Sequence, residues 1–394
     1  MLSPLLQVYK RCNIEFTAGK GVYLYSKDKK KYIDLGAGIA VNSLGYANKK
    51  LVKALKKAAD KPWHVSNLYE IEGQVELASK LVENSACDQV FFCNSGAEAI
   101  ETAVKIIRKH YHSKKQYQKK EVITFEHAFH GRTMTAISAA GSKKYQDGYA
   151  PLLPGFRYLS LKNLTIEKVA KEINSKTAAL IIEPIQGEGG VHVFSNKFLK
   201  DLAKLCKEKK IIFGVDEVQC GMGRTGKIFH HQWANIKPDI ITAAKGIGGG
   251  FPLGACLVRK DIASAMTMGS HGGTYGGSPL AMAVGNAVFA QIAEPKFLAS
   301  VQENGALFKE GLCSLQQQYP QIITEVRGEG LILGIRISHS YMKLVDLFRA
   351  NNLLTIPASN DVIRVIPPLI ITKKEIKLAL SYMEKSLKEF EQND

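Results

Sequence analysis

Residues 240–258 read IITAAKGIGGGFPLGACLV, nineteen residues that carry a single charge, Lys245. By apolar length this stretch could cross a membrane as one helix, but a glycine run followed by a proline would break such a helix in the middle. The pattern instead predicts a buried strand up to Ala244, a turn that carries Lys245, and a second strand from Leu253. This strand–turn–strand unit is the first indication of the fold.

Lys245 stands alone at the end of an apolar strand. Burial disfavours its ammonium form, so its amine becomes a usable nucleophile. The alternative is an ordinary lysine whose stem lies on apolar surface while the ammonium reaches water. Residues 240–258 alone leave both interpretations open. The glycines that follow Lys245 could provide room for a cofactor and for a neighbouring subunit.

The chain has 394 residues, enough for two domains that each bury a core. Its 45% hydrophobic and 23% charged residues are typical of a globular protein. The first residues, MLSPLLQVYKRC, hold too short an apolar run for a secretory signal, so we expect a cytoplasmic protein without a membrane segment. The seven cysteines form no CxxC pair, which favours free thiols in a reducing compartment.

The chain is basic, since 53 Lys and Arg residues against 36 Asp and Glu residues give a net charge of +17. Such a charge is compatible with nucleic acid or with acidic small molecules. The excess lies in short lysine clusters at 27–31, 114–120 and 207–210, without the interleaved aromatic residues of a nucleic-acid platform. A lysine-rich solvated surface is therefore the favoured interpretation, and we expect no nucleic-acid partner.

Outward from Lys245, short apolar runs alternate with helical patterns. The runs lie at 90–93, 122–125, 178–183, 211–218, 239–244 and 254–258, and helical patterns lie between several of them, for example at 96–109 and 195–209. Continuous apolar strands that alternate with helices indicate an α/β fold with a mostly parallel central sheet covered by helices on both faces.

The pattern changes after residue 279. We expect helices at 279–292, 295–317, 340–351 and from 373, with strands at 330–337 and 362–366. Residues 21–35 read as a hairpin that joins this part. The predicted organisation is a large domain at 46–290 and a smaller α+β domain built from 1–45 and 291–394.

Two nucleotide-binding patterns fail in their context. Gly221–Gly226 matches GxGxxG, but no clear helix follows it and no acidic residue lies at the expected distance downstream. Residues 221–227 also match GxxxxGK, but Ile228 replaces the hydroxyl residue that would hold magnesium. The histidine pairs, His127 and His130 among them, lack a Cys or carboxylate at metal-ligand spacing, so we expect no metal site.

The stronger signals follow the carboxyl ends of the predicted parallel strands, where such sheets bind ligands. The sequence NSGAE at 94–98 opens a helix, and its small residues with free N–H groups are typical of a phosphate site. A plain N-cap by Ser95 is an equally good interpretation. Asp216 and Glu217 emerge from an apolar strand, and Glu183 begins the glycine-rich loop EPIQGEGG. Buried acids need partners, such as an arginine or a protonated ring nitrogen of a cofactor.

Aromatic and cationic side chains complete the set. Phe129 and Arg132 offer a ring face and a guanidinium, and Arg364 stands alone among apolar residues in VIRVIPP. Either arginine could bind a carboxylate with two parallel hydrogen bonds. A nucleophilic lysine, an acid for a ring nitrogen, a phosphate cradle, a stacking ring and two arginines together suit pyridoxal phosphate acting on an amino acid.

Six ordered motifs resemble those of the class III pyridoxal-phosphate-dependent aminotransferases. They are NSGAEA (94–99), FHGRT (129–133), EPIQGEGG (183–190), DEVQCGMGRTG (216–226), AAKGIGGGFPLGA (243–255) and HGGTYGGSPLA (271–281). The resemblance covers nearly the whole chain. It implies a fold-type I transferase that uses pyridoxal 5'-phosphate and small-molecule amino-acid and 2-oxo-acid substrates, as a homodimer with shared active sites.

The resemblance also implies roles for single residues. Lys245 would be the lysine that binds the cofactor, Asp216 the partner of its ring nitrogen, and Phe129 the stacking ring. Ser95, Gly96 and Ala97 would hold the phosphate, and Thr274 would reach it from the neighbouring subunit. The remaining cofactor contacts are assigned to the residues that follow Asp216 in the same motif, Glu217, Val218 and Gln219.

Within the family, AGIAVNSLGY (37–46) and WHVSNLY (63–69) are most similar to the acetylornithine aminotransferases. This similarity implies transfer of the ω-amino group of N2-acetyl-L-ornithine to 2-oxoglutarate, a step of arginine biosynthesis. Arg132 would bind the carboxylate of acetylornithine, Arg364 the α-carboxylate of glutamate, and Glu188 would mask Arg364 when the ω-amine is bound.

Three positions depart from the family pattern: Ile100 stands where many relatives have Asn, Gly273 replaces a hydroxyl residue before Thr274, and Ser278 replaces Asn before a proline. None removes a catalytic group, but Gly273 belongs to the substrate assignment. Ornithine, succinylornithine, succinyldiaminopimelate and 4-aminobutyrate remain alternative amine donors, and a basic nucleotide- or RNA-binding protein is the alternative outside enzymes.

Overall fold

The computed structural model describes residues 4–392 and is built around a seven-stranded sheet. The strand order is β4–β12–β11–β10–β7–β5–β6, and all strands are parallel except β12, which runs antiparallel to β4 and β11. The strands are β4 (Gln89–Cys93), β5 (Glu121–Phe125), β6 (Phe156–Leu159), β7 (Thr177–Ile182), β10 (Ile212–Asp216), β11 (Ile240–Ala243) and β12 (Gly254–Val258). The predicted mostly parallel central sheet is confirmed.

Helices cover both faces of this sheet because side chains along each strand alternate between the faces. Ile212 packs with Ile107 of α4 (Gly96–Ser113) in one core, whereas its neighbour Phe213 packs with Leu202 of α8 (Asn196–Glu208) in another. Burial on both faces explains why the strands read as continuous apolar runs without polar alternation.

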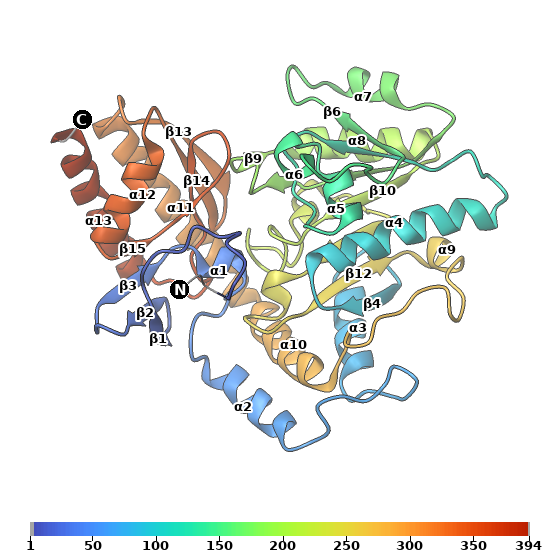
Figure 1. The fold of residues 1–394 in the computed structure, drawn as a ribbon, viewed down its shortest axis with the longest axis horizontal. Helices are drawn as coiled ribbons and strands as arrows, with labels where there is room; N and C mark the ends of the chain where they lie inside the picture. The colour runs from blue at the N-terminus through green and yellow to red at the C-terminus, as the bar shows by residue number, and fades with distance from the viewer. Residues whose placement is uncertain (1–3, 393–394) are drawn as a thin grey trace.

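A second part of the molecule joins the two ends of the chain. Its antiparallel sheet has the order β13–β14–β17–β16, and a mixed sheet has the order β1–β2–β3–β15, in which β15 runs parallel to β3. Figure 1 shows the blue N-terminal strands beside the red C-terminal helices. The elements are β1 (Phe16–Lys20), β2 (Tyr23–Ser26), β3 (Lys31–Asp34), β13 (Ile323–Glu329), β14 (Ile332–Ile337), β15 (Leu353–Leu354), β16 (Ile356–Pro357), β17 (Val362–Val365), α11 (Pro295–Gln318), α12 (Tyr341–Ala350) and α13 (Lys373–Gln392).

One hydrophobic core holds this second part together. It combines Val22, Ile33 and Leu35 with residues between Val301 and Phe390. The shared core and the β3–β15 pairing join the two ends of the chain, and the division into domains at 45 and 291 stays a prediction.

Shorter elements connect these layers. They are α1 (Ala37–Ala40), α2 (Lys49–Ala59), α3 (Gln74–Glu83), α5 (Met134–Ala139), α6 (Lys143–Gln146), α7 (Ile166–Glu172), β8 (Ile185–Gln186), β9 (His192–Val193), the 3-10 helices η1 (His230–Ala234) and η2 (Lys245–Ile247), α9 (Lys260–Ala263) and α10 (Pro279–Ile292). Among residues 4–392 no helix is long and apolar enough to cross a membrane.

The glycine run after Lys245 serves a different purpose from the expected one. A Cβ on Gly248 would lie 1.9 Å from the Phe251 carbonyl oxygen, and one on Gly246 would lie 2.7 Å from the Ser43 hydroxyl oxygen. The chain's own atoms therefore fill the space beside these two glycines. Only Gly250 lines the cavity described below. The prediction of open room along the whole run was wrong, because a tight turn needs the missing side chains for itself.

Candidate active site

A cavity of about 310 Å³ lies at the carboxyl ends of β4, β10 and β11. Parallel strands bring their carboxyl ends to one edge of the sheet, and this geometry gathers residues that are far apart in the sequence. Seven residues predicted for the site line the cavity together: Ser95, Gly96, Ala97, Phe129, Asp216, Val218 and Lys245.

Lys245 lies two residues after the end of β11 and has a φ of 48°, in the left-handed region that non-glycine residues seldom adopt. Such conformations are held by the surrounding structure and are often found at functional sites. Burial, with a further contribution from the positive Arg364, lowers the pKa of Lys245, against the opposing effect of nearby acids. Lys245 lines the cavity, and its lowered pKa favours the nucleophile over a lysine whose ammonium reaches water.

The N-terminus of α4 points at the same cavity. The Ser95 side chain caps the helix, because its hydroxyl oxygen accepts a hydrogen bond from the Glu98 N–H at 3.2 Å. The next N–H groups, of Gly96 and Ala97, have no acceptor within the helix, as at any helix N-terminus. A Cβ on Gly96 would lie 2.8 Å from Val218 Cγ1, so glycine lets Val218 pack against this helix end. The cap and an anion site are therefore compatible.

Asp216 ends β10 and is held by three hydrogen bonds. Its Oδ2 lies 2.7 Å from His130 Nδ1, and its Oδ1 accepts from the Val218 N–H and the Thr242 hydroxyl, each at 3.0 Å. The side chain is buried and lines the cavity. Its position in the cavity wall suits a carboxylate that pairs with a positive group inside the cavity.

His130 is a site residue that the sequence analysis left among structural histidines. Burial lowers its pKa, but the hydrogen bond and charge of Asp216, together with the charge of Glu183, outweigh burial and raise the pKa overall. Its Nε2 is buried without a hydrogen-bond partner in the described chain. Its place in FHGRT, beside Phe129, was the signal that could have identified it.

Glu183 is a buried carboxyl group whose charge also acts on the pKa of His130. Burial raises the pKa of Glu183 to about 8, while His130 and the Phe129 N–H, which donates to Glu183 Oε2 at 2.9 Å, act in the opposite direction. At neutral pH this carboxyl group therefore carries a proton. Asp216, which lies 2.7 Å from His130 Nδ1, is therefore the acid in direct contact with His130.

We expect Glu183→Gln to change how stability depends on pH. The unfolded chain loses the Glu183 proton near pH 4.5, whereas the folded chain keeps it to about pH 8. The free energy of unfolding of the wild type therefore falls across this window, by an amount on the order of a few kcal/mol, and the neutral glutamine removes that loss.

Urea midpoints of both proteins at pH 5 and pH 8, at one protein concentration, measure this effect. The variant should gain stability relative to the wild type as the pH rises. An equal difference at both pH values would contradict the raised pKa.

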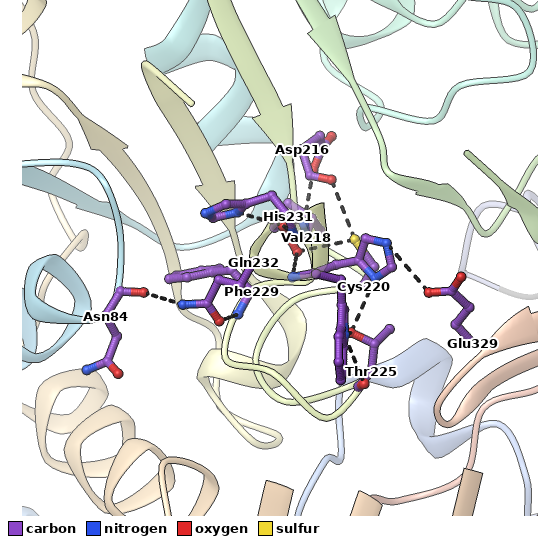
Figure 2. A network of polar contacts seen from close by, with 12 residues as sticks. Asn84, Asp216, Val218, Cys220, Thr225, Phe229, His231, Gln232 and Glu329 are labelled. Carbon is purple, nitrogen blue, oxygen red and sulfur yellow. Dashed lines mark hydrogen bonds and ion pairs between the residues drawn. The ribbon is translucent and has the colours of Figure 1, made fainter. Parts of the chain in front are cut away.

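Glu217, predicted as a cofactor contact, lies away from the cavity. Its carboxylate accepts from the His230 N–H at 2.8 Å and from the N–H and Nδ1 of His231 at 2.7 and 3.0 Å, and Cys220 Sγ lies 3.3 Å from it. Figure 2 shows Cys220 and His231 in this network below Asp216. Glu217 thus fixes the chain after β10 and, through it, the position of Asp216.

Arg364 and Glu188 form the ion pair at which the second substrate group was expected. Arg364 Nη1 and Nη2 lie 2.5 and 3.0 Å from the two carboxylate oxygens of Glu188, and Arg364 is only 1% exposed. Arg364 Nη1 also donates to Gln219 Oε1 at 3.4 Å. Both charges act on the pKa of Lys245, Glu188 raising it and Arg364 lowering it, although neither residue is among those that line the cavity.

Arg132 is exposed and packs on Phe129, a ring that lines the cavity. Its guanidinium carbon is 5.5 Å from the centre of the Phe129 ring and 4.3 Å from that of Tyr145. The two rings meet edge to face at 5.4 Å. Because Arg132 is exposed and stacks on these rings, its charge is oriented but still available to a carboxylate.

Gly273 and Thr274 lie outside the cavity of their own chain. Both are exposed, and Gly273 lines a separate hollow with Asn67 and His271. Asn67 Nδ2 donates to the carbonyl oxygens of Gly273 and Gly276 at 3.1 and 3.0 Å. A single chain therefore does not bring Thr274 to Lys245.

Comparison with known proteins decides the family. Residues 7–387 match the model of the family described as aminotransferase class-III. The chain belongs to the class III aminotransferases. It is 48% identical to an acetylornithine aminotransferase of Agrobacterium fabrum over 97% of this chain and 95% of that protein. It is 42% identical to one of Clostridium acetobutylicum over 98% and 99% of the two chains.

Solved structures agree with this family. The ornithine aminotransferase of Toxoplasma gondii superposes with a TM-score of 0.94 and 29% identity, over 99% of this chain and 94% of that one. The N-acetylornithine aminotransferase of Stenotrophomonas maltophilia superposes with a TM-score of 0.85 and 33% identity, over 98% of each chain. The expected transaminase with a fold-type I architecture is thereby confirmed.

The cavity fits pyridoxal 5'-phosphate, the cofactor of this family. It offers an amine, an acid, a helix N-terminus and apolar walls, and the Nε2 of His130 beside Asp216 lacks a partner. Among the side chains of residues 4–392, no group of three or more His, Cys, Asp or Glu residues could hold a metal ion. The polar groups at this site suit an organic phosphate.

Proposed function

We propose that this aminotransferase moves the ω-amino group of N2-acetyl-L-ornithine to 2-oxoglutarate, giving N-acetyl-L-glutamate 5-semialdehyde and L-glutamate. The ion pair between Arg364 and Glu188 carries the proposal. An arginine that can pair with a neighbouring acid suits an enzyme that binds glutamate, which has two carboxylates, and acetylornithine, which has one. The names of the relatives from Agrobacterium fabrum and Clostridium acetobutylicum support the same substrate.

The charges explain the need for such a mask. Glutamate carries two carboxylates, whereas acetylornithine carries one and a neutral acetamide. When acetylornithine is bound, an open Arg364 would be a buried cation without a partner, which is costly. Pairing with Glu188 removes that cost. When glutamate or 2-oxoglutarate binds, its α-carboxylate takes the place of Glu188 on Arg364, and Arg132 binds the other end.

In this proposal Asp216 binds the cofactor's ring nitrogen, the N-terminus of α4 binds its phosphate, and Phe129 and Val218 form apolar walls. When bound, pyridoxal phosphate supplies a ring that accepts electrons from the substrate carbon. Lys245 would hold the cofactor through its side-chain amine, and the same amine, when free, would carry the proton at the substrate carbon. His130 keeps Asp216 oriented through the 2.7 Å contact between its Nδ1 and Asp216 Oδ2.

We also propose a homodimer, located in the cytoplasm. Trp63, Leu68, Tyr69 and Tyr275 are exposed, and Leu68 is 88% exposed. Their two segments meet where the ring of His64 lies 5.2 Å from that of Tyr275. Such an apolar patch is typical of a protein interface, and it adjoins Thr274, which could thus reach a partner's phosphate site. Light scattering should give twice the chain mass of 43.3 kDa, and a monomer that is fully active would contradict this.

The substrate is tested by comparing amine donors with the holoenzyme. With 2-oxoglutarate as acceptor, acetylornithine should give the highest kcat/KM among acetylornithine, ornithine, succinylornithine, succinyldiaminopimelate and 4-aminobutyrate. A higher value for one of the other four would reassign the substrate within the family. Absence of transamination with all five donors would refute the proposed function.

A further inference from the structure

The loop at 187–190, which carries Glu188, is held by an unusual series of backbone contacts. It connects β8 to β9, which pair with each other as a two-stranded antiparallel sheet. Three successive carbonyl oxygens each accept a hydrogen bond from the C-terminal part. The carbonyls of residues 188, 189 and 190 accept, in that order, from the Ser359 N–H at 3.1 Å, Asn360 Nδ2 at 3.0 Å and Arg327 Nη1 at 3.2 Å.

The loop backbone has little space on either side. A Cβ on Gly189 would lie 2.7 Å from the His127 carbonyl oxygen, and one on Gly190 would lie 2.8 Å from the Ser359 carbonyl oxygen. Gly190 also has a φ of 96°, which few other residues tolerate. The loop is therefore fixed between two chain segments and is not built as a swinging lid.

The same small sheet provides the three donors and Arg364. Ser359 and Asn360 lie in the turn between β16 and β17, and Arg364 lies on β17. Arg327 on β13 pairs with Gly334 of β14, which in turn pairs with Arg364. One rigid frame thus fixes both the guanidinium and the backbone from which the Glu188 side chain extends.

We propose that Asn360 and Arg327 are positioning residues that set how readily Glu188 returns to Arg364, and thereby the balance between ω-amine and α-amino-acid substrates. This inference rests on the proposed function. Because the loop backbone is fixed, the ion pair opens only by rotation of the Glu188 side chain. Closing the pair therefore costs little conformational entropy. A looser loop would disfavour the closed pair and leave Arg364 exposed to dicarboxylates.

Asn360→Gly tests this role without straining the turn. Asn360 has a φ of 61°, which glycine adopts freely, so the change removes the side chain with its amide donor and introduces no strain. Loss of one such hydrogen bond should lower kcat/KM for acetylornithine about 3- to 10-fold. The affinity for glutarate, a dicarboxylate without an amine, should rise by a similar factor in calorimetry on the holoenzyme. Arg327→Met should act in the same direction.

Asn163→Gly is the matched control, since Asn163 is also exposed and left-handed, with a φ of 51°, but lies outside the site. It should change neither quantity. If Asn360→Gly lowered kcat/KM equally for acetylornithine and glutamate, or left the affinity for glutarate unchanged, the inference would be wrong. Transamination by the wild type would still support the proposed function. A wild type that transaminates no donor would instead refute the proposed function itself.

Discussion

Lys245→Ala is expected to fold normally and to lose transamination by at least about a thousandfold, because both the attachment point of the cofactor and the proton carrier are removed. Alanine keeps a Cβ, so the left-handed φ of 48° is no more strained than in the wild type. The change also removes a buried amine, which should leave stability unchanged or slightly higher. Steady-state rates with acetylornithine and 2-oxoglutarate, and circular dichroism for the fold, measure both effects.

The control is Lys204→Ala, since Lys204 is an exposed lysine on α8 whose side chain is 77% accessible. It should keep wild-type rates. A Lys245→Ala protein with more than a tenth of wild-type turnover would remove Lys245 from the mechanism.

Asp216→Asn should lower kcat about 100- to 1,000-fold. Asparagine keeps the size and an oxygen for the hydrogen bonds from the Val218 N–H and Thr242, but it loses the negative charge that would face the cofactor's ring nitrogen. Losses of this size follow removal of a preorganised electrostatic partner in an active site. The pKa of His130 should also fall, because Asp216 is what raises it against burial.

Thr242→Val separates the charge from the positioning of Asp216. It removes the 3.0 Å hydrogen bond to Asp216 Oδ1 but leaves the carboxylate. A neutral hydrogen bond contributes about 1 kcal/mol, so kcat should fall less than about tenfold. Equal rates for Asp216→Asn and Thr242→Val would contradict a role for the charge.

The sequence was most informative where local patterns decide the structure. The apolar runs at β7, β10 and β11 are buried strands, and the ends of β10 and β11 bring Asp216 and Lys245 to one sheet edge. Two edge strands were missed, because β6 is only partly buried and β1 is mostly exposed, so neither shows a continuous apolar run.

Side-chain direction beyond a strand end was harder to predict. Asp216 and Glu217 looked equivalent as acids after β10, yet Asp216 lines the cavity and Glu217 binds His231 on the other side. Successive side chains of an extended chain point to opposite faces, which explains why these two neighbouring acids lie on different sides. The contact of His130 with Asp216 spans 86 residues, and no spacing rule predicts it.

Glu188 and Arg364 are 176 residues apart in the sequence, and their ion pair forms only when the sheet that carries β17 packs against the loop after β8. The resemblance to a family, not the pattern of residues, suggested it. Thr274 illustrates a further limit, because its exposed position becomes meaningful only when a second chain is considered.

The most direct test of the central claim is to locate the cofactor on the chain. The purified holoenzyme is reduced with borohydride to fix the lysine-bound pyridoxal phosphate, and its peptides are then analysed by mass spectrometry. We predict one modified residue, Lys245, within the stretch 240–258. Attachment at another lysine, or no attachment in a protein that transaminates, would contradict the assignment of this cavity as the active site.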